Sequence, residues 1–97
     1  MVTIGMNYYV REGKERVFED ACRRVLEALS GAEGHEESRI YRCLEEDSGP
    51  EYLIVSRWQS EEPFRAFIAS SAFRKVTDWG AQNILSGRPR HTTYRTD

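Results

Sequence analysis

Apolar and polar residues alternate along the first ten positions of the chain. From residue 2 to residue 10 the even positions are all apolar or aromatic, whereas the odd positions are Thr3, Gly5, Asn7 and Tyr9. A period of two is typical of a strand with two different faces. Residues 51–58 are rich in β-branched and aromatic side chains and follow a Ser-Gly-Pro turn. We therefore predict strands over residues 2–10 and Glu51–Trp58.

Three other segments show the spacing of an amphipathic helix. Gly13–Ser30 repeats apolar pairs at helical spacing and carries charges of both signs on its other face. Glu61–Ala69 follows Ser60, a favourable N-cap, and has acidic residues in its first turn. Ser71–Leu85 is stopped by a glycine two residues beyond its end. These segments predict three helices.

The remaining segments complete a recognisable order of elements. Glu37–Glu45 and Arg90–Arg95 are predicted as strands, with a turn at residues 46–50. The order β-α-β-β-α-α-β predicts an α+β fold, a ferredoxin-like antiparallel sheet with the helices on one face. Residues 1–97 are long enough for a single domain. The other sheet face then needs cover, so we expect a homodimer through this open face, a dimeric α+β barrel. A substrate pocket is expected between the sheet and the second and third helices.

Composition excludes several classes of function. The net charge is −2, with 14 basic and 16 acidic side chains mixed along the chain. We therefore expect no positive electrostatic surface that would attract nucleic acid or a membrane. No apolar stretch could span a bilayer, and no basic segment followed by an apolar one opens the chain, which favours a cytoplasmic protein. The two cysteines are interpreted as reduced, and no metal-ligand spacing is present. Phosphate-loop and dinucleotide-binding motifs are missing, so no metal or organic cofactor is predicted.

Three short motifs carry a family resemblance that extends over nearly the whole chain. They are Gly5-Met6-Asn7-Tyr8 in the first strand, Gly13-Lys14-Glu15 before the first helix, and Trp58-Gln59-Ser60. The chain resembles the antibiotic biosynthesis monooxygenase family of dimeric α+β barrels, which includes quinol-forming monooxygenases and haem-degrading enzymes. The resemblance implies a homodimer that oxidises a small aromatic or quinol-type substrate with dioxygen. A dimer of the same scaffold that binds a small molecule without catalysis is an alternative, because one fold hosts many functions.

Asn7 and His91 are the candidate catalytic residues. We assign the odd face of the first strand to the helices, which places Asn7 and Tyr9 in the pocket and Tyr8 on the dimer side. The resemblance implies that the Asn7 amide holds a substrate oxygen or dioxygen by a hydrogen bond. His91, on the last strand, is a candidate general acid or base, although a surface histidine is the simpler interpretation.

The other candidate substrate-binding residues are mainly aromatic. Besides Tyr9, they are Trp58, Phe67, Phe73, Thr77 and Trp79, with core packing a strong alternative for Trp58. In the haem-degrading branch a tryptophan faces the porphyrin and a histidine binds the iron, and Phe67 and Thr77 stand at the matching positions here. Threonine is not among the usual haem ligands. Haem binding therefore remains an alternative, with His91 or His35 as the iron ligand.

Overall fold

The computed structural model describes residues 1–45 and 49–95. These residues form, in order, β1 (Val2–Tyr9), α1 (Glu15–Ser30), β2 (His35–Arg42), β3 (Glu51–Trp58), α2 (Glu61–Ile68), α3 (Ser71–Asn83) and β4 (Arg90–Arg95). The predicted order of elements is confirmed. The predicted turn at residues 46–50 falls largely on residues 46–48, which lie outside the described residues.

The boundaries of β2 differ from the prediction. The strand begins at His35 and ends at Arg42, rather than covering Glu37–Glu45. Gly34 has a φ of +82°, a conformation that suits glycine, and its carbonyl accepts a hydrogen bond from the Gln59 N–H at 2.8 Å. This turn brings the chain alongside β3 directly after the loop, so pairing starts two residues earlier than predicted.

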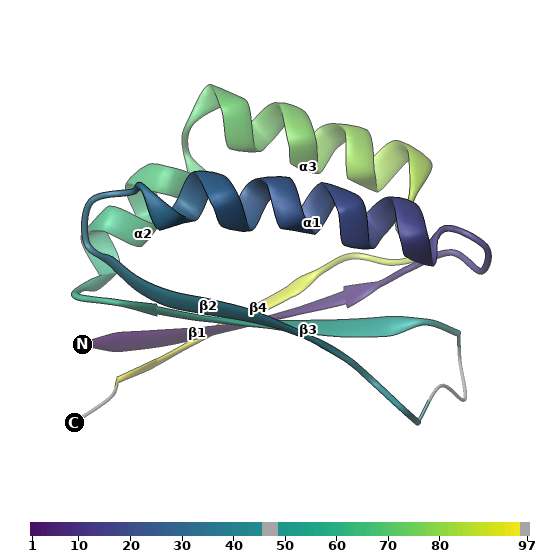
Figure 1. Ribbon diagram of the computed structural model, residues 1–97, viewed down its shortest axis with the longest axis horizontal. Coiled ribbons are helices and arrows are strands. Elements are labelled where there is room, and N and C mark those ends of the chain that lie inside the picture. Colours follow the sequence, from purple (N-terminus) through teal and green to yellow (C-terminus); the bar gives the residue numbers. More distant parts are fainter. Residues whose placement is uncertain (46–48, 96–97) are drawn as a thin grey trace.

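The described strands form an antiparallel sheet in the order β2-β3-β1-β4, and all three helices cover the same face of it (Figure 1). In the central pair, Ile4 lies opposite Ser56 and Tyr8 opposite Tyr52. Directly opposed residues of an antiparallel pair project to the same side. The predicted ferredoxin-like arrangement, with helices on one face only, is therefore confirmed.

The even positions of β1 face the helices, so the predicted facing of this strand is wrong. Ile4, Met6 and Val10 are between 0% and 5% exposed and belong to one core cluster with residues of α1, α2 and β3. This is the more continuous apolar stripe of the strand, and burying it removes the larger apolar area from water. Asn7 and Tyr9 consequently project from the other side of the sheet, which we call the open sheet face.

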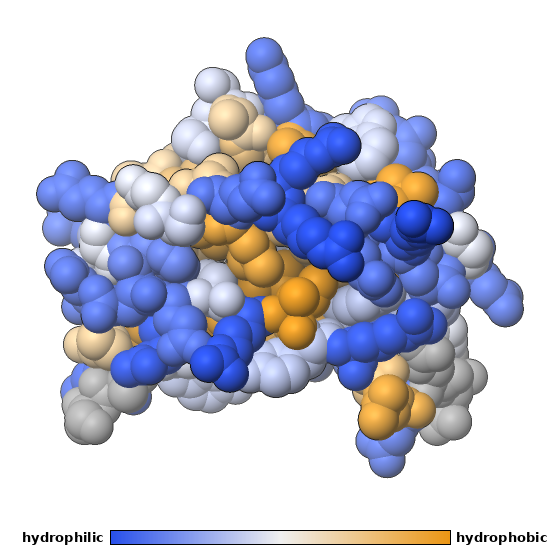
Figure 2. Space-filling model, viewed as in Figure 1, coloured by the Kyte–Doolittle hydropathy of each residue, from blue (hydrophilic) through white to orange (hydrophobic). Residues whose placement is uncertain are grey.

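Charged and polar side chains cover most of the surface on the side seen in Figure 2, where hydrophobic atoms show through between α1 and the sheet. Exposed large apolar side chains elsewhere include Trp79 on α3 and Tyr41 and Tyr94 on the outer strands. Within residues 1–45 and 49–95, no helix has both the length and the apolar character needed to cross a membrane.

Candidate functional site

A large cavity of about 640 Å³ lies between α1, α3 and the sheet. Tyr8 and Ile54 form the sheet side, and α1 contributes Phe18, Cys22 and Val25. Ala21 of α1 and Arg11, just after β1, also line it, and the rest of the wall comes from α3 and the segment that leads to β4: Phe73, Val76, Thr77, Asp78, Trp79, Gly80, Ala81, Ile84, Leu85, Ser86, Gly87, Arg88 and Pro89. The cavity is therefore bounded by α1 and α3, not by α2 and α3 as predicted, because α2 packs tightly over the end of β3.

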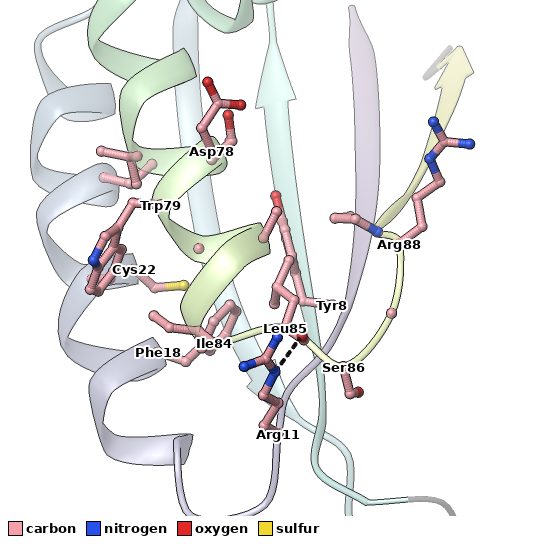
Figure 3. A pocket seen from close by; sticks show the side chains of 18 of the residues that line it. Tyr8, Arg11, Phe18, Cys22, Asp78, Trp79, Ile84, Leu85, Ser86 and Arg88 are labelled. Atoms are coloured by element: carbon pink, nitrogen blue, oxygen red, sulfur yellow. Dashed lines mark hydrogen bonds between the residues drawn. The ribbon is translucent and has the colours of Figure 1, made fainter.

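Hydrogen bonds between the end of β1 and the end of α3 close one end of this cavity. The Arg11 N–H donates to the Ile84 carbonyl at 2.8 Å, and the Arg11 Nε donates to the Leu85 carbonyl at 3.0 Å (Figure 3). The Ser86 N–H donates to the Tyr9 carbonyl at 2.9 Å. The segment after α3 is thus tied to β1 and holds Arg88 on the β4 side of the cavity.

Tyr8 projects from β1 into the cavity and brings a phenol to an otherwise apolar wall (Figure 3). Its ring packs against Phe18 at a centroid distance of 5.5 Å, and its hydroxyl has only a long contact to the Met6 sulfur at 3.8 Å. Burial, with a smaller effect from Cys22, raises the pKa of Tyr8 to about 12. The hydroxyl is therefore protonated at neutral pH and retains a donor for an oxygen atom in the cavity.

Cys22 forms part of the apolar wall. The side chain is 7% exposed, and burial together with nearby Glu19 raises the pKa of its thiol to about 12. The nucleophilic form of cysteine is the thiolate. At neutral pH Cys22 is therefore a packing residue.

His91 lies beside Tyr8 on the same side of the sheet. It is paired with Met6 across the β1–β4 ladder, and its ring centroid is 6.3 Å from that of Tyr8. Although His91 is exposed at the surface, partial desolvation of its ring lowers its pKa below the usual value of 6.5. A neutral imidazole at physiological pH can accept a proton. His91 is adjacent to the cavity through Tyr8 and is not one of its lining residues.

Three of the predicted substrate-binding residues line the cavity. Phe73, Thr77 and Trp79 all project from α3, and Trp79 remains 45% exposed. Val25, Phe73, Val76 and Trp79 also border a smaller hollow between α1 and α3. Trp79 therefore lines both spaces.

Trp58 and Phe67 occupy the aromatic core beneath α2 instead of the large cavity. Trp58 is 0% exposed, and its ring lies 5.7 Å from Phe64 and 6.1 Å from Phe67. Phe67 in turn lies 5.2 Å from Phe73 and connects this core to the cavity wall. The core interpretation of Trp58 is therefore the correct one.

Asn7 and Tyr9 do not line this cavity, which corrects their predicted placement. Asn7 lies opposite Leu53 and Arg90 in the sheet, on the open sheet face. The neighbouring Gly5 on that face lies against Leu53 and Tyr94. Tyr8 was predicted on the dimer side and takes the pocket position instead. The signal that could have located it is the continuous apolar stripe of even positions, which marks the face that helices cover.

Side chains that could ligate iron are few near the cavity. Thr77 lines it where a ligating histidine would be expected from the resemblance. The His35 Nε2 is hydrogen-bonded to the Ser38 hydroxyl at 2.8 Å, and the His35 ring packs on Trp58. Across the described parts of the chain, no group of three or more His, Cys, Asp or Glu side chains could hold a metal ion.

This fold and cavity define a small ferredoxin-like α+β domain with an apolar pocket between its helices and its sheet. The chain belongs to the antibiotic biosynthesis monooxygenase family, whose sequence profile matches residues 1–79.

Two groups of proteins are similar to the chain in sequence. A candidate heme-binding protein from Natronomonas pharaonis is 33% identical over 92% of this chain, and an uncharacterized protein from Bacillus subtilis, YczJ, is 30% identical over 77%. The match covers 78% of the Bacillus protein but only 14% of the Natronomonas protein. The chain thus spans a small fraction of its haloarchaeal relative.

Solved structures with the same fold are much more distant in sequence. A conserved protein from Methanosarcina mazei matches with a TM-score of 0.87 at 19% identity, over 99% of this chain and 92% of that one. SnoaB, a cofactor-independent oxygenase from Streptomyces nogalater, matches with a TM-score of 0.80 at 20% identity, over 98% of this chain and 91% of that one. These similarities establish the fold.

Proposed function

We propose that the chain is a monooxygenase that oxidises a small aromatic substrate of the quinol or anthrone type with dioxygen, without a metal or organic cofactor. The observation that carries this proposal is the apolar cavity of about 640 Å³ with a protonated phenol, Tyr8, in its wall and a neutral histidine, His91, beside it. SnoaB, a structural neighbour that shares the fold, is a cofactor-independent oxygenase.

The cavity suits a planar, largely apolar ligand. Its volume lies within the range of about 300–1,000 Å³ that is usual for small-molecule pockets. Phe18, Phe73 and Trp79 supply aromatic surfaces from the two helices. Arg11, Asp78 and Arg88 bring charged groups to the same lining. A substrate with an aromatic body and polar oxygen substituents matches this distribution.

The proposed reaction needs no external reductant. The proton that the substrate loses passes to His91, which borders the cavity through Tyr8, and the resulting carbanion or phenolate reduces dioxygen. For an anthrone, the methylene carbon becomes a carbonyl, one oxygen atom stays on that carbon and the other leaves as water. The substrate supplies all four electrons. Tyr8 donates a hydrogen bond to the substrate oxygen on which negative charge develops.

Oxygen consumption by the purified chain tests this proposal. We would screen quinols and anthrones with an oxygen electrode and identify the products by mass spectrometry in ¹⁸O₂. Loss of one such donor typically lowers kcat by roughly 100-fold or more, so Tyr8→Phe should fall to this extent. Tyr94→Phe, on an exposed tyrosine of β4, is the matched control. A Tyr8→Phe variant with undiminished kcat would contradict the assigned role.

The proposed assembly is a homodimer through the open sheet face. Leu53 and Val55 lie on this face with Gly5, and Tyr41 and Tyr94 on the outer strands are 49% and 57% exposed. Covering these side chains would remove apolar area from water. Sedimentation equilibrium should give twice the chain mass, and Val55→Arg should shift the protein to the monomer. A wild-type monomer at micromolar concentration would refute this assembly.

Haem binding is the second candidate function, and the name of the Natronomonas relative favours it. That name describes a protein of which this chain matches only 14%. A hemin titration decides the question. A saturable Soret shift at one haem per chain, lost in His91→Ala or His35→Ala, would support haem binding, and the absence of specific binding would leave the oxygenase proposal.

A further inference from the structure

A second, much smaller void lies behind the large cavity, inside the core between the sheet and the three helices. Its volume is about 20 Å³. Every residue that lines it is buried or half-buried. Most of the wall is aliphatic or aromatic, with Met6 and Ile54 on the sheet side, Leu29 on α1, and Phe64 and Ile68 on α2.

Most polar groups around this void are already hydrogen-bonded to other groups of the protein. The Ser56 hydroxyl accepts the Trp58 Nε1–H at 2.7 Å and shares a hydrogen bond of 2.7 Å with the Ser38 hydroxyl. Ser38 is in turn bonded to the His35 Nε2 at 2.8 Å. Tyr8 is the other polar residue of the wall. A buried water typically makes about three hydrogen bonds, and this wall does not offer them.

An apolar diatomic molecule fits the void better than water does. A volume of about 10–15 Å³ already admits one water-sized probe, so the void holds one small molecule and excludes an aromatic substrate. Dispersion contact with the surrounding carbon atoms favours an apolar guest, which sacrifices no hydrogen bonds on leaving water. Dry apolar cavities in proteins bind xenon and benzene for the same reason.

The void adjoins the large cavity. Tyr8, Val25, Ile54 and Phe73 line both spaces, so these side chains form a wall that the void and the pocket share. Rotamer changes of such side chains are fast compared with typical turnover. We propose that the void is a holding site for dioxygen, which reaches the substrate past Tyr8 and Phe73. This inference rests on the proposed oxygenase function.

Nuclear magnetic resonance under dioxygen pressure tests occupancy without any substrate. Dioxygen is paramagnetic, so methyl groups that line the void should relax faster under dioxygen than under nitrogen at equal pressure. We expect an enhancement at the Leu29, Ile54 and Ile68 methyls that is several-fold larger than at Val10. Val10 is 2% exposed and lines neither space, which makes it the control for general dioxygen solubility in the core. Equal enhancement at all four residues would overturn the proposal.

A filling variant tests the role of the void in turnover. Ile68 ends α2 and is half-buried, so Ile68→Phe can place its ring in the void with limited strain. Val17→Phe adds the same kind of bulk on α1, at a residue that is 41% exposed and lines none of these spaces. Ile68→Phe should abolish the relaxation enhancement and raise the KM for dioxygen several-fold. The Kd of the Ile68→Phe variant for the aromatic substrate should equal that of the wild type.

The two proposals fail in different ways. If no quinol or anthrone is oxidised, the proposed function fails, whereas the relaxation experiment still decides whether dioxygen occupies the void. If turnover is observed but Ile68→Phe leaves the KM for dioxygen unchanged, the holding site is refuted and the oxygenase stands. Should Ile68→Phe not fold, Leu26→Phe fills the same void from α1 and replaces it in both measurements.

Discussion

Replacing Ser56 by alanine removes the hydrogen-bond acceptor of a fully buried tryptophan. Ser56 and Trp58 are both 0% exposed, so water cannot replace the lost partner of the Trp58 N–H. A buried donor left unsatisfied costs about 1–3 kcal/mol, and complete burial favours the upper half of this range. We therefore expect Ser56→Ala to lower the free energy of unfolding by about 2–3 kcal/mol. Each kcal/mol shifts the Tm of a chain of this size by about 4–8 °C, so a loss of 2 kcal/mol lowers it by about 8–16 °C.

Urea unfolding followed by circular dichroism measures this loss at fixed protein concentration, because a dimer would make stability concentration-dependent. Ser38→Ala is the matched control. This substitution removes the hydrogen bond between the Ser38 and Ser56 hydroxyls, which adjoins the Trp58–Ser56 bond. Because Ser38 is only half-buried, we expect the free energy of unfolding to fall by less than about 1 kcal/mol. A Ser56→Ala variant within 0.5 kcal/mol of the wild type would refute the reasoning that the buried N–H depends on this partner.

Three further predictions concern pH and ligand binding. Burial raises the pKa of Cys22 and of Tyr8 to about 12, so the unfolded chain loses protons that the folded chain keeps, above about pH 9 for Cys22 and above about pH 10 for Tyr8. Between those values and pH 12 the free energy of unfolding should fall by about 1.4 kcal/mol per pH unit for each group, and Cys22→Ala should reduce the slope of stability against pH. Partial desolvation lowers the pKa of the exposed His91, so its contribution to stability is present above pH 6.5 and is lost as the pH falls through the folded-state pKa. Urea unfolding at pH 7 and pH 5 should show a small loss, and His91→Gln should diminish it. Trp79→Ala should weaken binding of an aromatic ligand up to about tenfold in a fluorescence titration, because an aromatic pair contributes about 0.5–1.5 kcal/mol. The stability of the variant should change little, because Trp79 is 45% exposed.

The order of elements could be predicted from the sequence because each element has a local signature. The alternation in β1 and the apolar spacing of α1 both act within a few residues. Ser60 does precede α2 as predicted, but its side chain makes no capping hydrogen bond. The serine that caps a helix is Ser70, whose hydroxyl accepts the Phe73 N–H at 3.3 Å at the start of α3. The start of β2 depends instead on a contact between Gly34 and the distant Gln59, which no local pattern reveals.

The candidate site was only partly predictable, because a period of two identifies two faces without saying which one the helices cover. Placing Asn7 toward the helices assigned every residue of β1 to the wrong side of the sheet, so Tyr8 was not identified as a pocket residue. The cavity-lining residues of α3 could be identified because residues at helical spacing share one face of the helix. Phe73, Thr77 and Trp79 therefore line the cavity as predicted. The segment after α3 was missed because its place in the wall depends on its attachment to the end of β1.

That attachment has an evolutionary consequence. The match to the family profile covers residues 1–79, and the part of the cavity wall formed by residues 84–89 lies outside this match. All residues of β4 are exposed, so the strand contributes backbone pairing to β1 and little to the core. Exposed residues such as Arg88 can therefore mutate with small effects on folding while they change the pocket wall. A lineage could alter ligand preference there, with the buried core and the proposed role of Tyr8 inherited unaltered.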